Sequence, residues 1–255
     1  MYVHESGPRS TPTIVFLHGN ASSSSMWKAH FTYLADFHCL APAFPGFGRS
    51  SSEEWNSLDR TTDQVAKVIQ EKAAGGRAHI VGLSLGGTIG IVLLATYPEL
   101  IDHAIIDGAG VIPISTAPVM KLGFRLMEPV IKTGPVIRLM AKALNLPKQE
   151  FAVFERDIHA MSARSFQRSW SQALDLRCPP GMENVTCPIL FIAGEKELKE
   201  THESNRMLAK MMPHAQCRVA PKMGHGWLSE AEELHCRMVG AWINDQPLPP
   251  ELLNM

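Results

Sequence analysis

Residues 78–88 constrain the fold of this chain more than any other stretch. A short, β-rich apolar run at 78–81 is followed by Gly82-Leu83-Ser84-Leu85-Gly86, and an apolar helical pattern then covers residues 88–97. This order predicts a strand, a tight turn and a helix, with Ser84 at the apex and a glycine two residues away on each side to leave room for a strained backbone. Such a turn presents the serine hydroxyl beside the free N–H groups of the first helical turn, so the pattern indicates a nucleophile.

The rest of the chain alternates between apolar β runs and amphipathic helical patterns. The predicted strands lie at 2–5, 13–17, 38–41, 78–81, 103–106, 189–193 and 216–220, and the predicted helices between and after them at 26–35, 58–74, 88–97, 200–212 and 229–243. This alternation is typical of a mostly parallel, doubly wound α/β sheet with right-handed crossovers. The last dozen residues contain three prolines and are expected to form an extended tail.

The alternation stops between residues 111 and 184, where no strand is predicted. Helical patterns at 122–131, 135–144 and 150–173 predict a helical cap inserted into a core domain made of residues 1–110 and 185–255. The cap is rich in methionine, leucine and phenylalanine. These side chains are expected to pack the cap onto the core, with a subset lining an apolar pocket above Ser84; they include Met120, Leu122, Phe124, Leu126, Leu139, Phe154 and Met161. The lysines and arginines of the cap are expected to form its solvent-facing surface rather than a binding patch for a charged group.

Composition excludes several classes of protein. The formal net charge is −1, and no basic block is long enough to indicate nucleic acid or an anionic membrane as a partner. Five scattered cysteines without a C-x-x-C pair argue against a disulfide framework and a zinc site, and indicate a reducing compartment. The first residues lack a signal-peptide pattern, and no run approaches the ~18 apolar residues of a membrane span. A cytoplasmic protein is therefore expected, as a monomer or homodimer.

A serine nucleophile needs a base, and the base needs an orienting acid. Two late predicted strands end at Gly194-Glu195-Lys196-Glu197 and just before Gly224-His225-Gly226. Because the carboxyl ends of parallel strands meet at one edge of a sheet, these groups are expected near Ser84. The order nucleophile, acid, histidine resembles that of the α/β-hydrolase family. The resemblance extends over nearly the whole chain and is carried by His18-Gly19-Asn20, Pro45-Gly46-Phe47-Gly48-Arg49-Ser50, Gly82-Leu83-Ser84-Leu85-Gly86-Gly87, Gly194-Glu195-Lys196-Glu197 and Gly224-His225.

This resemblance implies a fold and a set of roles. The fold is the α/β-hydrolase fold without the family's first strand, since only 12 residues precede Thr13, and with the cap inserted after the family's sixth strand. Ser84 would be the nucleophile and His225 the base and subsequent acid. The backbone N–H groups of Asn20 and Leu85 would form the oxyanion hole, and His18 would brace the loop that carries Asn20. No metal or organic cofactor is implied.

The acid is the point at which this sequence departs from the family pattern. The family usually carries aspartate three residues after the strand-end glycine, where this chain has Glu197. Glutamate also serves as the acid in some members, so Glu197 is the first candidate. Asp107, at the end of the family's sixth strand, and Glu195 remain alternatives.

The identity of the nucleophile also limits the reactions that are expected. Haloalkane dehalogenases and epoxide hydrolases of this fold carry aspartate at the turn, so a serine implies hydrolysis of a carboxylic ester, thioester or lactone through an acyl-enzyme. The expected substrate is a small-molecule ester with a largely apolar acyl group, contacted by Trp27, Phe47, Leu198 and Trp227. Two alternatives stay open: a carbon–carbon bond hydrolase of the meta-cleavage product type, and a small-molecule receptor with slow hydrolase activity.

Overall fold

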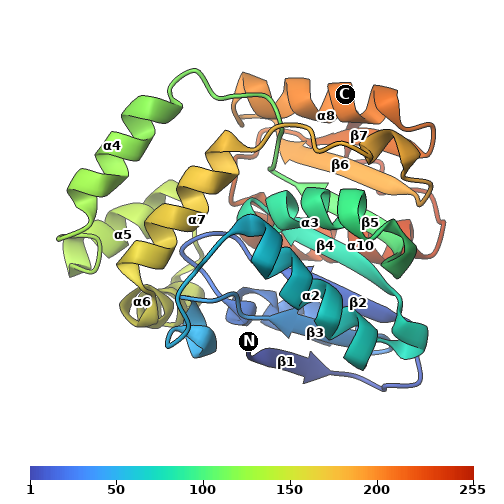
Figure 1. Ribbon diagram of the computed structural model, residues 1–255, viewed down its shortest axis with the longest axis horizontal. Helices are drawn as coiled ribbons and strands as arrows, with labels where there is room; N and C mark the ends of the chain where they lie inside the picture. The colour runs from blue at the N-terminus through green and yellow to red at the C-terminus, as the bar shows by residue number, and fades with distance from the viewer.

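The computed structural model describes residues 1–255 and is built around one sheet of eight strands (Figure 1). The strands are β1 (Val3–Ser6), β2 (Thr13–Leu17), β3 (His38–Pro42), β4 (Ala78–Leu83), β5 (Ile101–Asp107), β6 (Ile189–Gly194), β7 (Ala215–Ala220) and β8 (Leu253–Asn254). Their order across the sheet is β1-β3-β2-β4-β5-β6-β7-β8. The six inner strands are parallel, and the two edge strands are antiparallel to their neighbours. The predicted mostly parallel sheet is confirmed.

The two edges of the sheet are formed by the two ends of the chain. β1 is the outermost strand on one edge, with Val3 opposite Pro42 of β3. On the other edge β8 pairs with β7, and Leu253 lies opposite Val219. The prediction of a merely extended tail is therefore corrected, because the tail ends in a strand and the Leu252 side chain before it is buried. Pairing of this strand satisfies backbone groups that an open sheet edge would leave to solvent.

Helices cover both faces of the sheet. The helices of the core are α1 (Lys28–Tyr33), α2 (Leu58–Lys72), α3 (Leu85–Thr96), α8 (Lys199–Met211), α9 (Trp227–Glu230) and α10 (Glu232–Ile243). Helices α2, α3 and α8 pack on one face, and α1 and α10 pack on the other. Single-turn 3₁₀ helices connect these elements at Ser24–Trp27, Gly48–Ser50, Ala74–Gly76, Pro98–Leu100, Lys148–Glu150 and Met182–Asn184.

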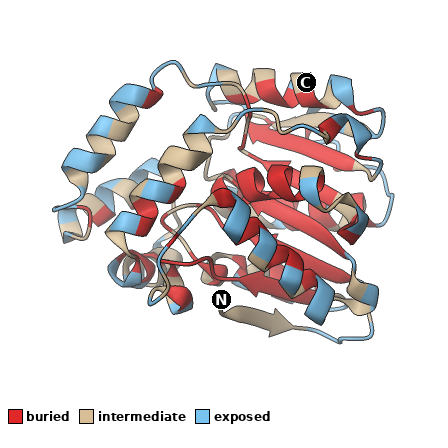
Figure 2. Cartoon of the chain, viewed as in Figure 1, coloured by how far each residue is buried: buried red, intermediate tan, exposed pale blue.

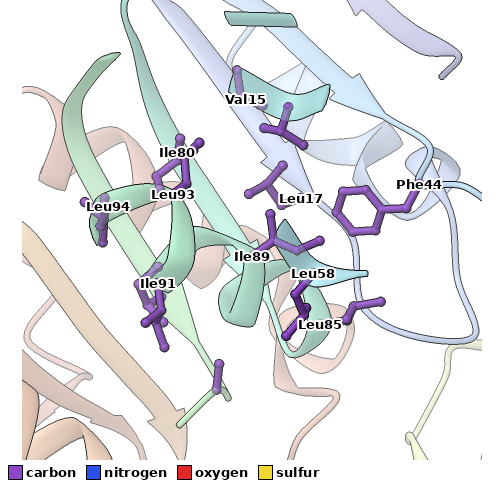
Figure 3. Packing of buried hydrophobic residues seen from close by; sticks show 14 of the residues in the cluster. Val15, Leu17, Phe44, Leu58, Ile80, Leu85, Ile89, Ile91, Leu93 and Leu94 are labelled. Atoms are coloured by element: carbon purple, nitrogen blue, oxygen red, sulfur yellow. The ribbon is translucent and has the colours of Figure 1, made fainter. Parts of the chain in front are cut away.

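The strands are apolar on both faces because both faces are covered. In β2, Val15 and Leu17 join the core beneath α3, whereas Ile14 and Phe16 join the core beneath α1 and α10. This period-two division is the reason why the parallel strands read as continuous apolar runs. Figure 3 shows Leu17 next to Ile89 of α3, and Figure 2 shows the central strands buried along their length.

Four helices lie between β5 and β6: α4 (Ala117–Met127), α5 (Gly134–Ala143), α6 (Phe151–Ala160) and α7 (Ala163–Asp175). We call residues 111–184 the helical insertion. It lies to one side of the sheet, at the carboxyl ends of the parallel strands (Figure 1). Contacts hold it there: the Ser162 N–H donates to the Gly46 carbonyl after β3 (2.9 Å), and Leu144 abuts Gly226 after β7.

Two predicted helices are each divided in two. The single helix expected over 150–173 breaks at Met161, whose backbone is extended (ψ 139°), and Ser162 then begins α7 by accepting a hydrogen bond from the Ser165 N–H (3.3 Å). The helix expected over 229–243 appears as α9 and α10, which meet at Ala231. In both places the apolar pattern continues across the break, so periodicity alone does not reveal it.

The apolar side chains of the helical insertion do not all point inward. Phe154 and Met161 are buried, as expected. Leu122, Leu126 and Leu139 are 57%, 70% and 64% exposed, so they do not pack into the core, and they line neither of the two cavities at Ser84. The prediction for these three leucines is wrong, because α4 and α5 carry apolar residues on more than one face.

Candidate active site

Ser84 lies in a strained turn between β4 and α3. Its φ of 55° and ψ of −112° place a non-glycine residue in a region that L-residues rarely adopt. The two flanking glycines are needed for close approach: a Cβ on Gly82 would lie 2.5 Å from the Gly86 carbonyl oxygen, and a Cβ on Gly86 would collide with the carbonyl of Leu17. The strand, turn and helix predicted around Ser84 are confirmed.

His225 and Glu197 are brought together by the loops that follow β7 and β6. The Nδ1 atom of His225 lies 3.0 Å from Oε2 of Glu197, whose side chain is almost fully buried. Burial disfavours the imidazolium, but the charge and hydrogen bond of Glu197 outweigh it and raise the pKa of His225. With Nδ1 donating to Glu197, Nε2 is left as an acceptor. Ser84 and His225 line the same two cavities, without a hydrogen bond between their side chains.

The three candidate carboxylates occupy different environments. Glu195 is exposed and accepts a hydrogen bond from the Lys222 N–H (2.6 Å). Asp107 is buried, and its Oδ1 accepts a hydrogen bond from the Trp227 indole N–H (3.1 Å). Of the three, only Glu197 makes a hydrogen bond to His225. The geometry thus favours Glu197 as the orienting acid.

Asp107 instead belongs to a buried polar network that sequence reasoning missed. His235 Nε2 lies 3.6 Å from Asp107 Oδ2, and His235 Nδ1 lies 2.8 Å from His30 Nε2. Burial, and then the nearby Glu197 charge, raise the pKa of Asp107 well above its usual range, while burial lowers the pKa of His235 to about 3. Burial thus disfavours the charged forms of both side chains. The available signal was the position of His235 on the apolar face of its predicted helix.

Two backbone N–H groups are available beside Ser84. Leu85 is the first residue of α3, where a helix leaves its N–H groups without intrahelical acceptors. The Asn20 N–H has no acceptor within the protein. The Asn20 side chain is tied to α7, since its Nδ2 donates to the Phe166 carbonyl (3.3 Å) and to Ser169 Oγ (3.2 Å). The Asn20 and Leu85 N–H groups are therefore candidate donors for an oxyanion beside Ser84.

The loop that carries Asn20 is held by His18. His18 Nδ1 lies 2.8 Å from the Gly19 carbonyl oxygen, and Nε2 accepts a hydrogen bond from the Phe44 N–H (3.0 Å). Burial lowers the pKa of His18 to about 4, so the ring is neutral and keeps one donor and one acceptor. The structure thus gives His18 the bracing contacts that the sequence resemblance implied.

Two cavities meet at Asn20, Ser84 and His225. The larger has a volume of about 740 Å³ and the smaller about 380 Å³. Apolar residues dominate one part of the larger cavity, including Leu85, Ile112, Ile114, Met120, Trp170, Leu174 and Leu198. The smaller cavity has more polar groups, including Ser22, Ser25, Lys28, Gln149, Glu150 and Asp157.

The predicted substrate-binding residues are only partly placed at these cavities. Leu198 lines the larger cavity. Trp27, Phe47 and Trp227 are fully buried and line neither cavity, so the prediction that they contact substrate is corrected. Each is instead packed in the interior: Trp27 lies against Phe16 (ring centroids 5.1 Å apart), Phe47 lies against His18, and Trp227 donates to Asp107.

No group of three or more histidine, cysteine, aspartate or glutamate side chains is arranged to hold a metal ion. The five cysteines are all free thiols. None of the helices has the length and apolar character required to cross a bilayer.

Fold and site together define a class of enzymes that use a nucleophile at a strand–helix turn. A model of the alpha/beta hydrolase family matches residues 14–235, and the chain belongs to this family. It is accordingly a hydrolase of this superfamily.

Relatives with several activities resemble the chain. It is 25% identical over 249 residues to an AB hydrolase superfamily protein of Gibberella zeae, covering 93% of this chain and 82% of that protein. It is 26% identical over 242 residues to a 2-hydroxy-6-oxononadienedioate/2-hydroxy-6-oxononatrienedioate hydrolase of a Pseudomonas species, covering 88% and 85%. It is 24% identical over 246 residues to Lipase 1 of Psychrobacter immobilis, covering 91% and 76%.

Solved structures share the fold. An esterase from Exiguobacterium antarcticum superposes with a TM-score of 0.80 at 16% identity, covering 95% of each chain. The enol-lactonase from Burkholderia xenovorans LB400 gives a TM-score of 0.79 at 18% identity, covering 95% of this chain and 96% of that one. At these identities the likeness establishes the fold alone.

Proposed function

We propose that this protein is a serine hydrolase that cleaves a carboxylic ester, thioester or lactone through an acyl-enzyme. Ser84 is the nucleophile, His225 the general base and acid, and Glu197 the orienting acid. The observation that carries this proposal is the 3.0 Å contact between Glu197 and His225, beside cavities that also contain the strained Ser84. A buried carboxylate paired with an imidazole and a serine in a rare backbone conformation have no evident role in packing.

The reaction proceeds in two halves. As Ser84 Oγ attacks the substrate carbonyl carbon, His225 Nε2 takes the hydroxyl proton, and Glu197 stabilises the resulting imidazolium. The carbonyl oxygen becomes an oxyanion that accepts hydrogen bonds from the Asn20 and Leu85 N–H groups. The tetrahedral adduct collapses as His225 returns the proton to the leaving oxygen. Water, deprotonated by His225, then attacks the acyl-enzyme, and release of the acid regenerates Ser84.

The two cavities support a substrate with an apolar acyl arm and a more polar leaving group. The larger cavity places Leu85, Ile112 and Met120 beside Ser84, and it is assigned to the acyl arm. The smaller cavity carries Lys28 and Asp157 and is assigned to the leaving group. The helical insertion contributes to both walls, which supports its role as a cap over the site. The proposed substrate is a small-molecule ester, and the proposed location of the protein is the cytoplasm.

A second candidate is carbon–carbon bond hydrolysis of a meta-cleavage product, which uses the same three residues. The observation in its favour is the likeness to the Pseudomonas hydrolase that carries such a name. A glycine is common in that group at the position of Asn20, whose side chain here is bound to α7 instead. Simple ester substrates therefore come first in the test.

The test is hydrolysis of p-nitrophenyl esters from acetate to decanoate. We expect Ser84→Ala to abolish turnover and Glu197→Gln to lower kcat by about 10²–10⁴-fold. Glu195→Gln is the matched control, because it removes a carboxylate from the same loop that does not contact His225. Equal losses in the two glutamine variants would refute the role of Glu197. If the wild type binds these esters but hydrolyses none of them measurably, the result would favour the alternative of a small-molecule receptor with slow hydrolase activity.

A further inference from the structure

Helix α4 has two apolar faces, of which only one is covered. Its inner face is packed: Met120 lines the larger cavity, and the Phe124 ring lies 4.1 Å from that of Trp170 on α7. On the other side, Val119 and Leu122 are 73% and 57% exposed, and Leu126, four residues on, is 70% exposed. Spacings of three and four residues align these side chains along the helix. We call Val119, Leu122 and Leu126 the outer stripe.

The outer stripe lies at the periphery of the molecule. α4 packs mainly against α7, which separates it from the helices on the sheet (Figure 1). Bands of exposed residues run along α4 in Figure 2. The next helix, α5, adds the exposed Leu139. Three large aliphatic side chains aligned on one helix face form an apolar surface of the kind that marks an interaction site.

Charge identifies the kind of partner. Residues 117–142 contain five basic side chains and one acidic side chain, a local formal charge of +4 in a chain whose overall charge is −1. Lys121 is paired with Asp175 (2.6 Å), and Lys132 donates to the His159 carbonyl (2.9 Å). The remaining cations are exposed, make no ion pair and lie within three positions of an exposed leucine in the sequence: Arg125, Arg138 and Lys142.

We propose, in contrast to the expectation from the sequence, that the outer stripe docks the protein onto an anionic lipid surface. Exposed aliphatic side chains flanked by basic residues enter the boundary between headgroups and acyl chains, while the cations bind the anionic headgroups. A second copy of the chain is a poorer occupant. A two-fold contact through this face would place the unpaired cations of one copy against those of the other, because both copies present the same patch. This inference concerns binding alone and stands independently of the proposed reaction.

The test is co-flotation of the full chain with large unilamellar vesicles, made of phosphatidylcholine alone or mixed equally with phosphatidylglycerol. We expect binding to the mixed vesicles that weakens with salt and is absent or much weaker on the neutral ones. Leu122→Ser/Leu126→Ser is expected to weaken binding at least about tenfold. Arg125→Gln/Arg138→Gln/Lys142→Gln is expected to weaken it by about fivefold for each charge removed.

The matched control is Leu253→Ser, which removes another half-exposed leucine far from α4 in the sequence and is expected to bind as the wild type does. Ser84→Ala is expected to keep full vesicle binding, so a failure of this inference is distinguishable from a failure of the proposed reaction. Equal binding by the wild type and the double serine variant would overturn the proposal. Self-association that the double serine variant abolishes would assign the surface to a second copy and would overturn it as well.

Discussion

Gly108 is the residue at which the geometry of the proposed acid–base pair is most directly testable. It follows β5 with a φ of +58°, and a Cβ on it would lie 2.9 Å from both Glu197 Oε1 and His225 Nδ1. Ordinary contacts of a Cβ begin at 3.4 Å, so an alanine requires these side chains to retreat by about 0.5 Å. The two atoms belong to the two partners of one hydrogen bond, and the displacement therefore acts on the pair itself.

Gly108→Ala has two expected effects. An alanine in the left-handed region costs about 1–2 kcal/mol, which corresponds to a fall in Tm of about 2–8 °C for a domain of this size. A displacement of 1 Å in a catalytic group costs about 10²-fold, so 0.5 Å is expected to lower kcat/KM by about tenfold. The measurements are thermal denaturation by circular dichroism and hydrolysis of p-nitrophenyl butyrate.

Gly75→Ala separates the two effects. Gly75 has a φ of +68°, and a Cβ on it would meet nothing within 4 Å. It therefore carries a comparable backbone cost without displacing any side chain, and we expect a similar fall in Tm with unchanged kcat/KM. If Gly108→Ala keeps full kcat/KM, or if both variants lose activity equally, the reasoning that links Gly108 to the pair of Glu197 and His225 is refuted.

Three further predictions concern the same site. Catalysis needs neutral His225, so kcat/KM is expected to fall as the pH drops through its raised pKa, and the fall should move to lower pH in Glu197→Gln; a pH–rate profile that does not move would contradict this. Ser169→Ala removes an acceptor of the Asn20 side chain, and we expect kcat to fall by up to about tenfold, whereas an unchanged kcat would show that the tether is dispensable. Burial disfavours the charged form of Asp107, and its hydrogen bond from the Trp227 indole needs only an acceptor oxygen, so Asp107→Asn is expected to change the free energy of unfolding in urea by less than about 1 kcal/mol; a larger loss would contradict this.

The sequence predicts the residues around Ser84 well because each carries a local signal. Gly82 and Gly86 mark the turn, and His225 and Glu197 follow glycines at the ends of apolar runs. The carboxyl ends of parallel strands share one edge, so these positions imply proximity without any knowledge of contacts. Choosing the orienting acid among Glu197, Asp107 and Glu195 required the structure, because residue spacing does not determine the direction of a side chain in a loop.

Predictions from the sequence were wrong about the positions of features that carry no local signal of this kind. An aromatic residue near a motif, such as Trp227, has the same appearance in sequence whether it lines a cavity or fills the interior. The division of the predicted helix at Met161 arises from a contact between Ser162 and Gly46, which are 116 positions apart. Similarly, periodicity shows that α4 has apolar faces, but only the position of α7 decides which of them is covered.

The attachment of α7 limits how far the helical insertion can behave as an exchangeable module. Gly46 has no room for a side chain because Ser165 lies against it, and Asn20 finds its acceptors at Phe166 and Ser169. The loops after β2 and β3 are thus fitted to one particular helix. A chimera that receives its insertion from another member of the family would need matching small and hydrogen-bonding residues at these α7 positions. Without them, the exchange would disturb the backbone beside Ser84 along with the substrate cavities.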